Sequence, residues 1–148
     1  MTSRIDTFTS TKKKQEYYSD FLDNFTKTPI GNELGRVINE KAVNQSLKNL
    51  VKTNLGERLF QPTVGCDVMN SLFELNGVLE ASQIEFAITN TIKFNEPRVN
   101  LLNVSVEYQN EPNTISVSII YSLINSIDKI TLNILLKDRK STRLNSSH

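Results

Sequence analysis

The sequence predicts an α+β domain in which about three helices pack on one face of an antiparallel β-meander. Three observations lead to this fold class. Apolar residues recur at spacings of three and four between residues 39 and 95. From residue 103 onward they alternate with polar residues, and the short segments NEPN and NSID separate the alternating stretches. The chain has 148 residues, so we expect one domain, and we assign residues 17–138 to it.

The N-terminal part of the chain is predicted to hold little regular structure. Residues 1–16 are polar and end in KKKQE, which favours a flexible, solvated arm. A phosphate-binding arm is the alternative, but three lysines support it weakly. Short extended pieces are expected around Phe21–Phe25 and Arg36–Ile38, because turn residues lie between them at 28–29 and 31–32.

The first helix is predicted over residues 39–54. Its apolar residues fall on one face: Ala42, Val43, Leu47, Leu50 and Val51. Asn39 is the expected N-cap, and Asn54 with Gly56 marks the end of the helix. The opposite face is polar and is expected to be solvated.

Two further helices are predicted before the sheet. One covers residues 67–76, with Asp67 as its N-cap and Asn76-Gly77 at its end. The other covers residues 80–95, and Pro97 ends it. The predicted apolar face of this last helix comprises Ile84, Ala87, Ile88 and Thr91, widened by Phe86, Ile92 and Phe94.

Three strands are predicted over residues 103–109, 114–124 and 129–137. In the last strand the apolar residues are Ile130, Leu132, Ile134 and Leu136. Its charged residues, Lys129, Lys137 and Asp138, lie only at its ends, so charge does not protect the middle of this edge. We therefore expect that either an N-terminal segment covers the edge or another chain pairs with it.

Composition excludes several classes of function. The net charge of +1 gives no overall attraction to nucleic acid or to an anionic membrane. No apolar run reaches a membrane span, and the N-terminus lacks the apolar segment of a secretory signal. A single cysteine cannot form an internal disulfide, which favours the cytoplasm. The only histidine is His148, so neither a catalytic triad nor a zinc site is expected, and no cofactor is predicted.

The C-terminal residues 139–148 are expected to be a non-native or disordered tail. They are polar and without periodicity, and they resemble a translated cloning or sequencing adapter. His148 belongs to this tail, so no functional role is assigned to it.

Paired carboxylates are the remaining route to catalysis, because a glycosidase needs only two of them. The candidates are Glu57, Asp67, Glu74, Glu80, Glu85 and Glu96. Asp67 is better explained as a helix cap, Glu57 is followed by Arg58, and Glu74 and Glu85 are predicted to face solvent. No pair stands where the surroundings would separate two pKa values, so lysozyme-type catalysis is not expected.

Residues 54–68, NLGERLFQPTVGCDV, are predicted to be an ordered connector between helices. Gly56, Pro62 and Gly65 shape the chain, and Asp67 begins the next helix. Leu55, Leu59 and Phe60 are expected to pack. Cys66 is predicted to be a small buried residue in a tight turn. Glu57 and Arg58 are the residues of this stretch that we expect to make contacts.

The sequence Glu96-Pro97-Arg98 lies at the junction between the last helix and the sheet. The proline stiffens the backbone, so two opposite charges are held at a fixed corner. One interpretation is an intramolecular salt bridge, which composition alone favours. The other is a docking point at which Arg98 offers a forked donor to a partner's carboxylate or carbonyl.

The combination of these stretches resembles a known family. The segment FTKTPIGNELGRVINEKAVNQSLKNLVKTNLGERLFQPTVGCDV, followed by a helix, NEPRVNLLNVSV and a β-meander, is similar to the baseplate wedge protein that initiates the sheath in contractile-tail phages. The family is also known as lysozyme-like or as baseplate assembly protein W. It includes the corresponding subunit of type VI secretion systems and a bacterial anti-adaptor. The resemblance covers about residues 17–138.

The resemblance implies a structural role without cofactors. It implies that Glu96, Pro97 and Arg98 dock on the helical core bundle of other wedge proteins. It also implies that the meander presents an edge to which the tail sheath protein adds strands, in multiple copies within a hexagonal assembly. The expected location is the virion baseplate, assembled in the host cytoplasm. A peptidoglycan-cleaving enzyme and a regulatory module of the anti-adaptor kind remain the alternatives.

Overall fold

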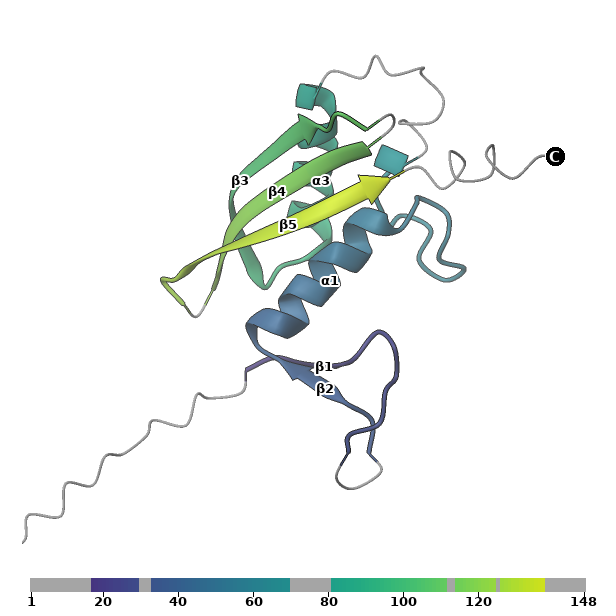
Figure 1. Cartoon of the computed structure of the whole chain (residues 1–148), viewed down its shortest axis with the longest axis vertical. Helices are drawn as coiled ribbons and strands as arrows, with labels where there is room; N and C mark the ends of the chain where they lie inside the picture. Colours follow the sequence, from purple (N-terminus) through teal and green to yellow (C-terminus); the bar gives the residue numbers. More distant parts are fainter. Residues whose placement is uncertain (1–16, 30–32, 70–80, 112–113, 125, 138–148) are drawn as a thin grey trace, which may run out of the picture.

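The computed structural model describes residues 17–29, 33–69, 81–111, 114–124 and 126–137, and these form an α+β fold (Figure 1). The named strands of the first half are β1 (Ser19–Phe21) and β2 (Arg36–Ile38), followed by helix α1 (Glu40–Lys52). Helix α3 (Ala81–Asn95) then leads into β3 (Val99–Tyr108), β4 (Thr114–Leu123) and β5 (Lys129–Lys137). The predicted meander is therefore present.

The helix count differs from the prediction. The described residues contain two complete helices, α1 and α3, where about three were expected. Of the helix predicted over residues 67–76, Val68 and Met69 are helical, and the part from residue 70 onward lies outside the described residues. The arm at 1–16 and the tail at 139–148 also lie outside them.

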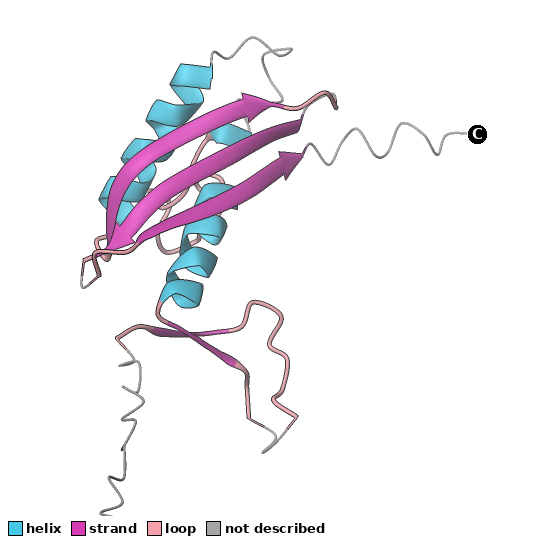
Figure 2. Cartoon of the chain, turned by 60° about the vertical axis from the view of Figure 1, so that its left-hand side comes forward, coloured by secondary structure: helices cyan, strands magenta, loops and turns pink. Residues whose placement is uncertain are grey.

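Strands β3, β4 and β5 form one antiparallel sheet in that order (Figure 2). Val106 of β3 pairs with Val117 of β4, which pairs in turn with Ile134 of β5. A register shift between Leu101 and Asn103 leaves Leu102 as an extra residue, a β-bulge. A second, two-stranded sheet of β1 and β2 lies at the N-terminal end of α1 (Figure 1).

The core lies between the helices and one face of the three-stranded sheet (Figure 2). The predicted apolar face of α1 is confirmed, since all five of its residues are buried. In β4 every second residue from Ile115 to Leu123 is buried, as the period of two predicts. Helix α3 contributes Ile84, Ile88 and Ile92. Its Phe86 and Phe94 were expected to widen that face, but they are 69% and 84% exposed.

Asn39 does not cap α1 with its side chain, contrary to the prediction. Its Oδ1 instead accepts hydrogen bonds from the backbone N–H groups of Tyr17, at 2.9 Å, and Tyr18, at 3.3 Å. The Asn39 backbone carbonyl still accepts the first helical bond, from Val43. The side chain therefore attaches the segment leading into β1 to the start of α1.

Candidate functional site

The Glu96–Arg98 corner is a closed ion pair within the chain. Arg98 Nε donates to Glu96 Oε1 at 2.6 Å, and Arg98 Nη2 donates to Oε2 at 2.7 Å. The corner itself is short, because the N–H of Val99 already donates back to the Glu96 carbonyl. The two parallel bonds are the fork geometry in which arginine binds a carboxylate most strongly. The intramolecular salt bridge, one of the two interpretations of this corner, is thus present.

Glu96 belongs to the interior of the protein. Its exposed fraction is 4%, and Ser46 of α1 donates a third hydrogen bond, to Oε2 at 2.6 Å. Burial acts to raise the pKa of this carboxyl, but the hydrogen bonds from Arg98 and Ser46 and the charge of Arg98 outweigh it. The pKa of Glu96 therefore lies below its ordinary value. The carboxylate stays ionised and ties α1 to the start of β3.

Arg98 is the partly exposed member of the pair. Its side chain is 33% exposed, and its guanidinium carbon lies 5.6 Å from the centre of the Tyr18 ring, within cation–π range. The hydrogen bond to Glu96 raises the pKa of Arg98. Two N–H groups of the guanidinium are used on Glu96, and the group carries five. The outer rim of Arg98 therefore keeps donors that a partner could use.

The connector at residues 54–68 is held together at its base. Gly56 N–H donates to the Pro62 carbonyl at 2.9 Å, and Cys66 N–H donates to the Thr53 carbonyl at 2.8 Å. Gly65 has φ +148, and a Cβ there would lie 2.7 Å from the Thr53 carbonyl oxygen. Only glycine fits such a position without a backbone shift. Cys66 is buried, as predicted, and burial raises the pKa of its thiol.

The tip of the same connector points into solvent. Leu59 is 91% exposed and Phe60 is 96% exposed, so the prediction that they pack is wrong. Glu57 turns back and accepts a hydrogen bond from the Asn54 N–H at 2.9 Å, while Arg58 is exposed. Asp67 is exposed as well. The connector is therefore a rigid support for an apolar tip.

The four residues predicted as the strand edge lie with their side chains toward the core. Ile134 and Leu136 are buried, and Ile130 and Leu132 are partly buried against the core. Their main-chain N–H and C=O groups face the neighbouring strand β4 and not the free edge. The N–H of Val106 points away from β4, so Val106 and Val117 form a pair without mutual hydrogen bonds. The main-chain groups of Val117 therefore face β5, where they pair with those of Ile134.

The outward main-chain groups of β5 therefore belong to the alternate residues. By the same alternation these are Thr131, Asn133 and Leu135, with Lys129 and Lys137 at the ends. Their side chains are exposed on the face away from the helices. Within the described residues β5 pairs with β4 alone. The sequence pattern drew attention to the apolar residues of this strand, whereas the residues that face the free edge are the ones between them.

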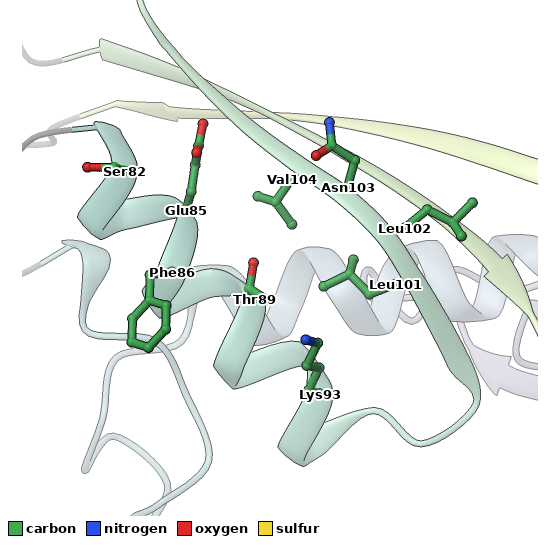
Figure 3. Close-up of a pocket in the computed structure, with 9 residues that line it drawn as sticks. All are labelled: Ser82, Glu85, Phe86, Thr89, Lys93, Leu101, Leu102, Asn103 and Val104. Atoms are coloured by element: carbon green, nitrogen blue, oxygen red, sulfur yellow. The ribbon is translucent and has the colours of Figure 1, made fainter.

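The other edge of the sheet carries a side-chain contact that the sequence did not indicate. Glu85 was expected to face solvent, but its Oε1 accepts a hydrogen bond from the Val106 N–H at 2.9 Å. A groove of about 330 Å³ runs between α3 and β3 at this edge (Figure 3). It is lined by Ser82, Glu85, Phe86, Thr89, Lys93, Leu101, Leu102, Asn103 and Val104.

The described carboxylates each have a structural partner or an exposed position. Glu57 and Glu85 accept backbone hydrogen bonds, and the pKa of Glu96 is lowered, whereas a catalytic acid needs a raised pKa. Glu74 and Glu80 lie outside the described residues. Among the residues that the structure describes, no group of three metal-binding side chains occurs, and no helix could span a membrane.

An ion-paired corner, an exposed apolar tip and a strand edge that is unpaired among the described residues are features typical of a small domain that binds other proteins. Residues 38–127, more than half of the chain, match the family described as baseplate wedge protein gp25. The chain belongs to this family. A member from Enterobacteria phage T4, baseplate wedge protein gp25, is 32% identical over 113 residues, covering 76% of this chain and 85% of that protein. The resemblance inferred from the sequence is thereby confirmed.

Solved structures share the fold. A protein from Geobacter sulfurreducens, labelled a tail lysozyme, gives a TM-score of 0.55 at 22% identity and covers 68% of this chain and 93% of its own. A chain of the anti-feeding prophage baseplate gives a TM-score of 0.55 at 17% identity and covers 88% and 94%. At these identities the likeness concerns the fold alone, so the lysozyme label transfers no activity.

Proposed function

We propose that this chain is a structural subunit of a contractile-tail baseplate wedge, and that its β5 edge starts assembly of the tail sheath by strand addition. The family supports the wedge role. The observation that carries the finer proposal is the β5 edge, which no other described strand covers and where Thr131, Asn133 and Leu135 turn their main-chain groups outward. A strand added there forms regular main-chain hydrogen bonds, and its alternate side chains supply specificity.

The corner is the proposed attachment to the wedge core bundle. Glu96 is buried and holds Arg98 through two bonds, so its part is to orient the guanidinium. Pro97 is exposed and Arg98 is partly exposed, and these two side chains form the surface available to a partner. A carboxylate or a helix C-terminal carbonyl on the core bundle fits the remaining donors of Arg98.

The wider setting follows from this role. The subunit acts without a cofactor and without enzymatic activity, in the baseplate of the virion, after assembly in the host cytoplasm. Its partners are the other wedge proteins and the sheath protein, with several copies in a hexagonal baseplate.

The edge is tested by one pair of variants at Asn133. In Asn133→Pro the outward N–H is lost and no bond to β4 is removed, whereas Asn133→Ala keeps the N–H. We expect phage that carry Asn133→Pro to make baseplates with naked tubes, visible by electron microscopy, and Asn133→Ala phage to carry full sheaths. Sheathed tails in a folded Asn133→Pro variant would refute strand addition at β5.

The corner is tested with Arg98→Lys, which keeps the charge but loses the fork. We expect the variant subunit to fold and to be missing from purified wedges. Arg98→Ala is less suitable, because it leaves Glu96 buried without its cation. Normal incorporation of Arg98→Lys would argue against docking through the guanidinium donors that Glu96 leaves available.

The enzyme alternative is tested on the same protein. A turbidity assay on bacterial cell walls is expected to show no clearing. Clearing that is lost in Glu57→Gln or Glu74→Gln would replace the structural proposal with a hydrolase.

A further inference from the structure

The two edges of the sheet differ in a way that bears on how strands can add. At β3 the outward N–H of Val106 is occupied by the Glu85 carboxylate, which reaches across from α3 (Figure 3). A few residues earlier the β-bulge at Leu102 interrupts the ladder. Bulges and inward-reaching charges are two devices by which proteins prevent unwanted pairing at a sheet edge.

Exposed apolar side chains lie beside the β3 edge, so protection matters there. Phe86 on α3 is 69% exposed, and Leu102 on β3 is 46% exposed, and both line the groove beside the edge. An extended strand that entered here would gain apolar contacts in addition to main-chain bonds. An exposed apolar edge of this kind promotes association between copies.

We propose that Glu85 closes the β3 edge, so that the meander accepts a strand at β5 alone. A strand arriving at β3 would have to remove the carboxylate from the Val106 N–H and place its own carbonyl oxygen beside that negative charge. Both steps are unfavourable. The closure is a property of the isolated chain. Only the identity of the strand that adds at β5 rests on the proposed function.

The test compares Glu85→Ala with Glu85→Gln in the full chain. Glutamine keeps a carbonyl oxygen that can accept from Val106, and alanine does not. In Glu85→Ala we expect the Val106 amide to exchange with deuterium at least about tenfold faster than in the wild type, because a bond to a charged acceptor is lost. Exchange in Glu85→Gln should stay closer to the wild type.

Association between copies is the second readout. With both edges open, Glu85→Ala should form species larger than dimers that grow with concentration in sedimentation velocity. The wild type and Glu85→Gln have one open edge and should stop at dimers at most. Adding Asn133→Pro to Glu85→Ala should stop the growth as well, since one edge is closed again.

Equal exchange and equal association in the wild type and Glu85→Ala would overturn the inference. That outcome is separate from the sheath test. If Asn133→Pro still abolishes sheath formation, strand addition at β5 stands while closure by Glu85 falls. If Asn133→Pro leaves sheaths intact but Glu85→Ala polymerises, the closure stands and the proposed start of the sheath by strand addition at β5 falls. Circular dichroism on every variant confirms that the comparison is made between folded chains.

Discussion

Replacing Arg98 with alanine should destabilise the isolated subunit substantially. Glu96 is 4% exposed and, of its side-chain hydrogen-bond partners, would keep only Ser46. Removing one partner of a buried pair costs about 3–5 kcal/mol, and we expect the lower end, about 3 kcal/mol, because Arg98 is itself 33% exposed. For a domain of this size that corresponds to a melting temperature lower by roughly 6–12 °C, measured by circular dichroism.

The pH dependence gives this prediction its specific signature. The folded-state pKa of Glu96 lies below the ordinary value of about 4.3, so the pair contributes stability above that pH. This contribution is lost as the pH falls through the lower, folded-state pKa. The melting temperatures of wild type and Arg98→Ala should therefore differ most near neutral pH and converge in acid.

The exposed pair of Lys137 and Glu111 is the matched control. Lys137 Nζ lies 2.8 Å from Glu111 Oε2, but the two side chains are 52% and 65% exposed. Lys137→Ala should leave the melting temperature almost unchanged, because exposed pairs contribute little. Equal losses in Arg98→Ala and Lys137→Ala, or a loss that does not shrink in acid, would refute the argument from burial.

Two further predictions concern residues with well-defined geometry. Gly65→Ala should cost more than about 2 kcal/mol in denaturant unfolding, since strain and a backbone clash coincide, whereas Gly56→Ala (φ +82, open space) should cost about 1 kcal/mol. A smaller effect from Gly65→Ala than from Gly56→Ala would contradict this. Tyr121→Phe should cost about 1 kcal/mol, because the buried hydroxyl donates to Asn44 Oδ1 at 2.8 Å. The pKa of Tyr121 is raised to about 12 by burial and by nearby carboxylates, so ultraviolet titration should show one tyrosine ionising last, and its absence in Tyr121→Phe checks the assignment.

The strands and the faces of α1 and β4 were predictable because burial there repeats with the period of the element. The bounds of β5, Lys129–Lys137, agree with the prediction for the same reason. Register is a different matter. The bulge at Leu102 depends on how β3 meets β4, and nothing in the local pattern of apolar residues indicates an extra residue.

The missed residues are those whose role depends on a partner distant in sequence. Asparagine is a common helix N-cap, but the side chain of Asn39 instead accepts hydrogen bonds from the N–H groups of Tyr17 and Tyr18. Glu85 lies next to the predicted apolar stripe of α3, yet the packing of that helix places it at the edge of β3. The period of the apolar residues predicts which side chains are buried. It does not predict which distant group a polar side chain will bind.

The tip formed by Leu59 and Phe60 has a thermodynamic consequence. Its base is fixed by Gly56, Gly65 and Cys66, so a partner that covers it orders little new chain. Covering two side chains that are more than nine-tenths exposed removes apolar surface from water. In a calorimeter, association through this tip would appear as a negative heat-capacity change, and Phe60→Ser would reduce it.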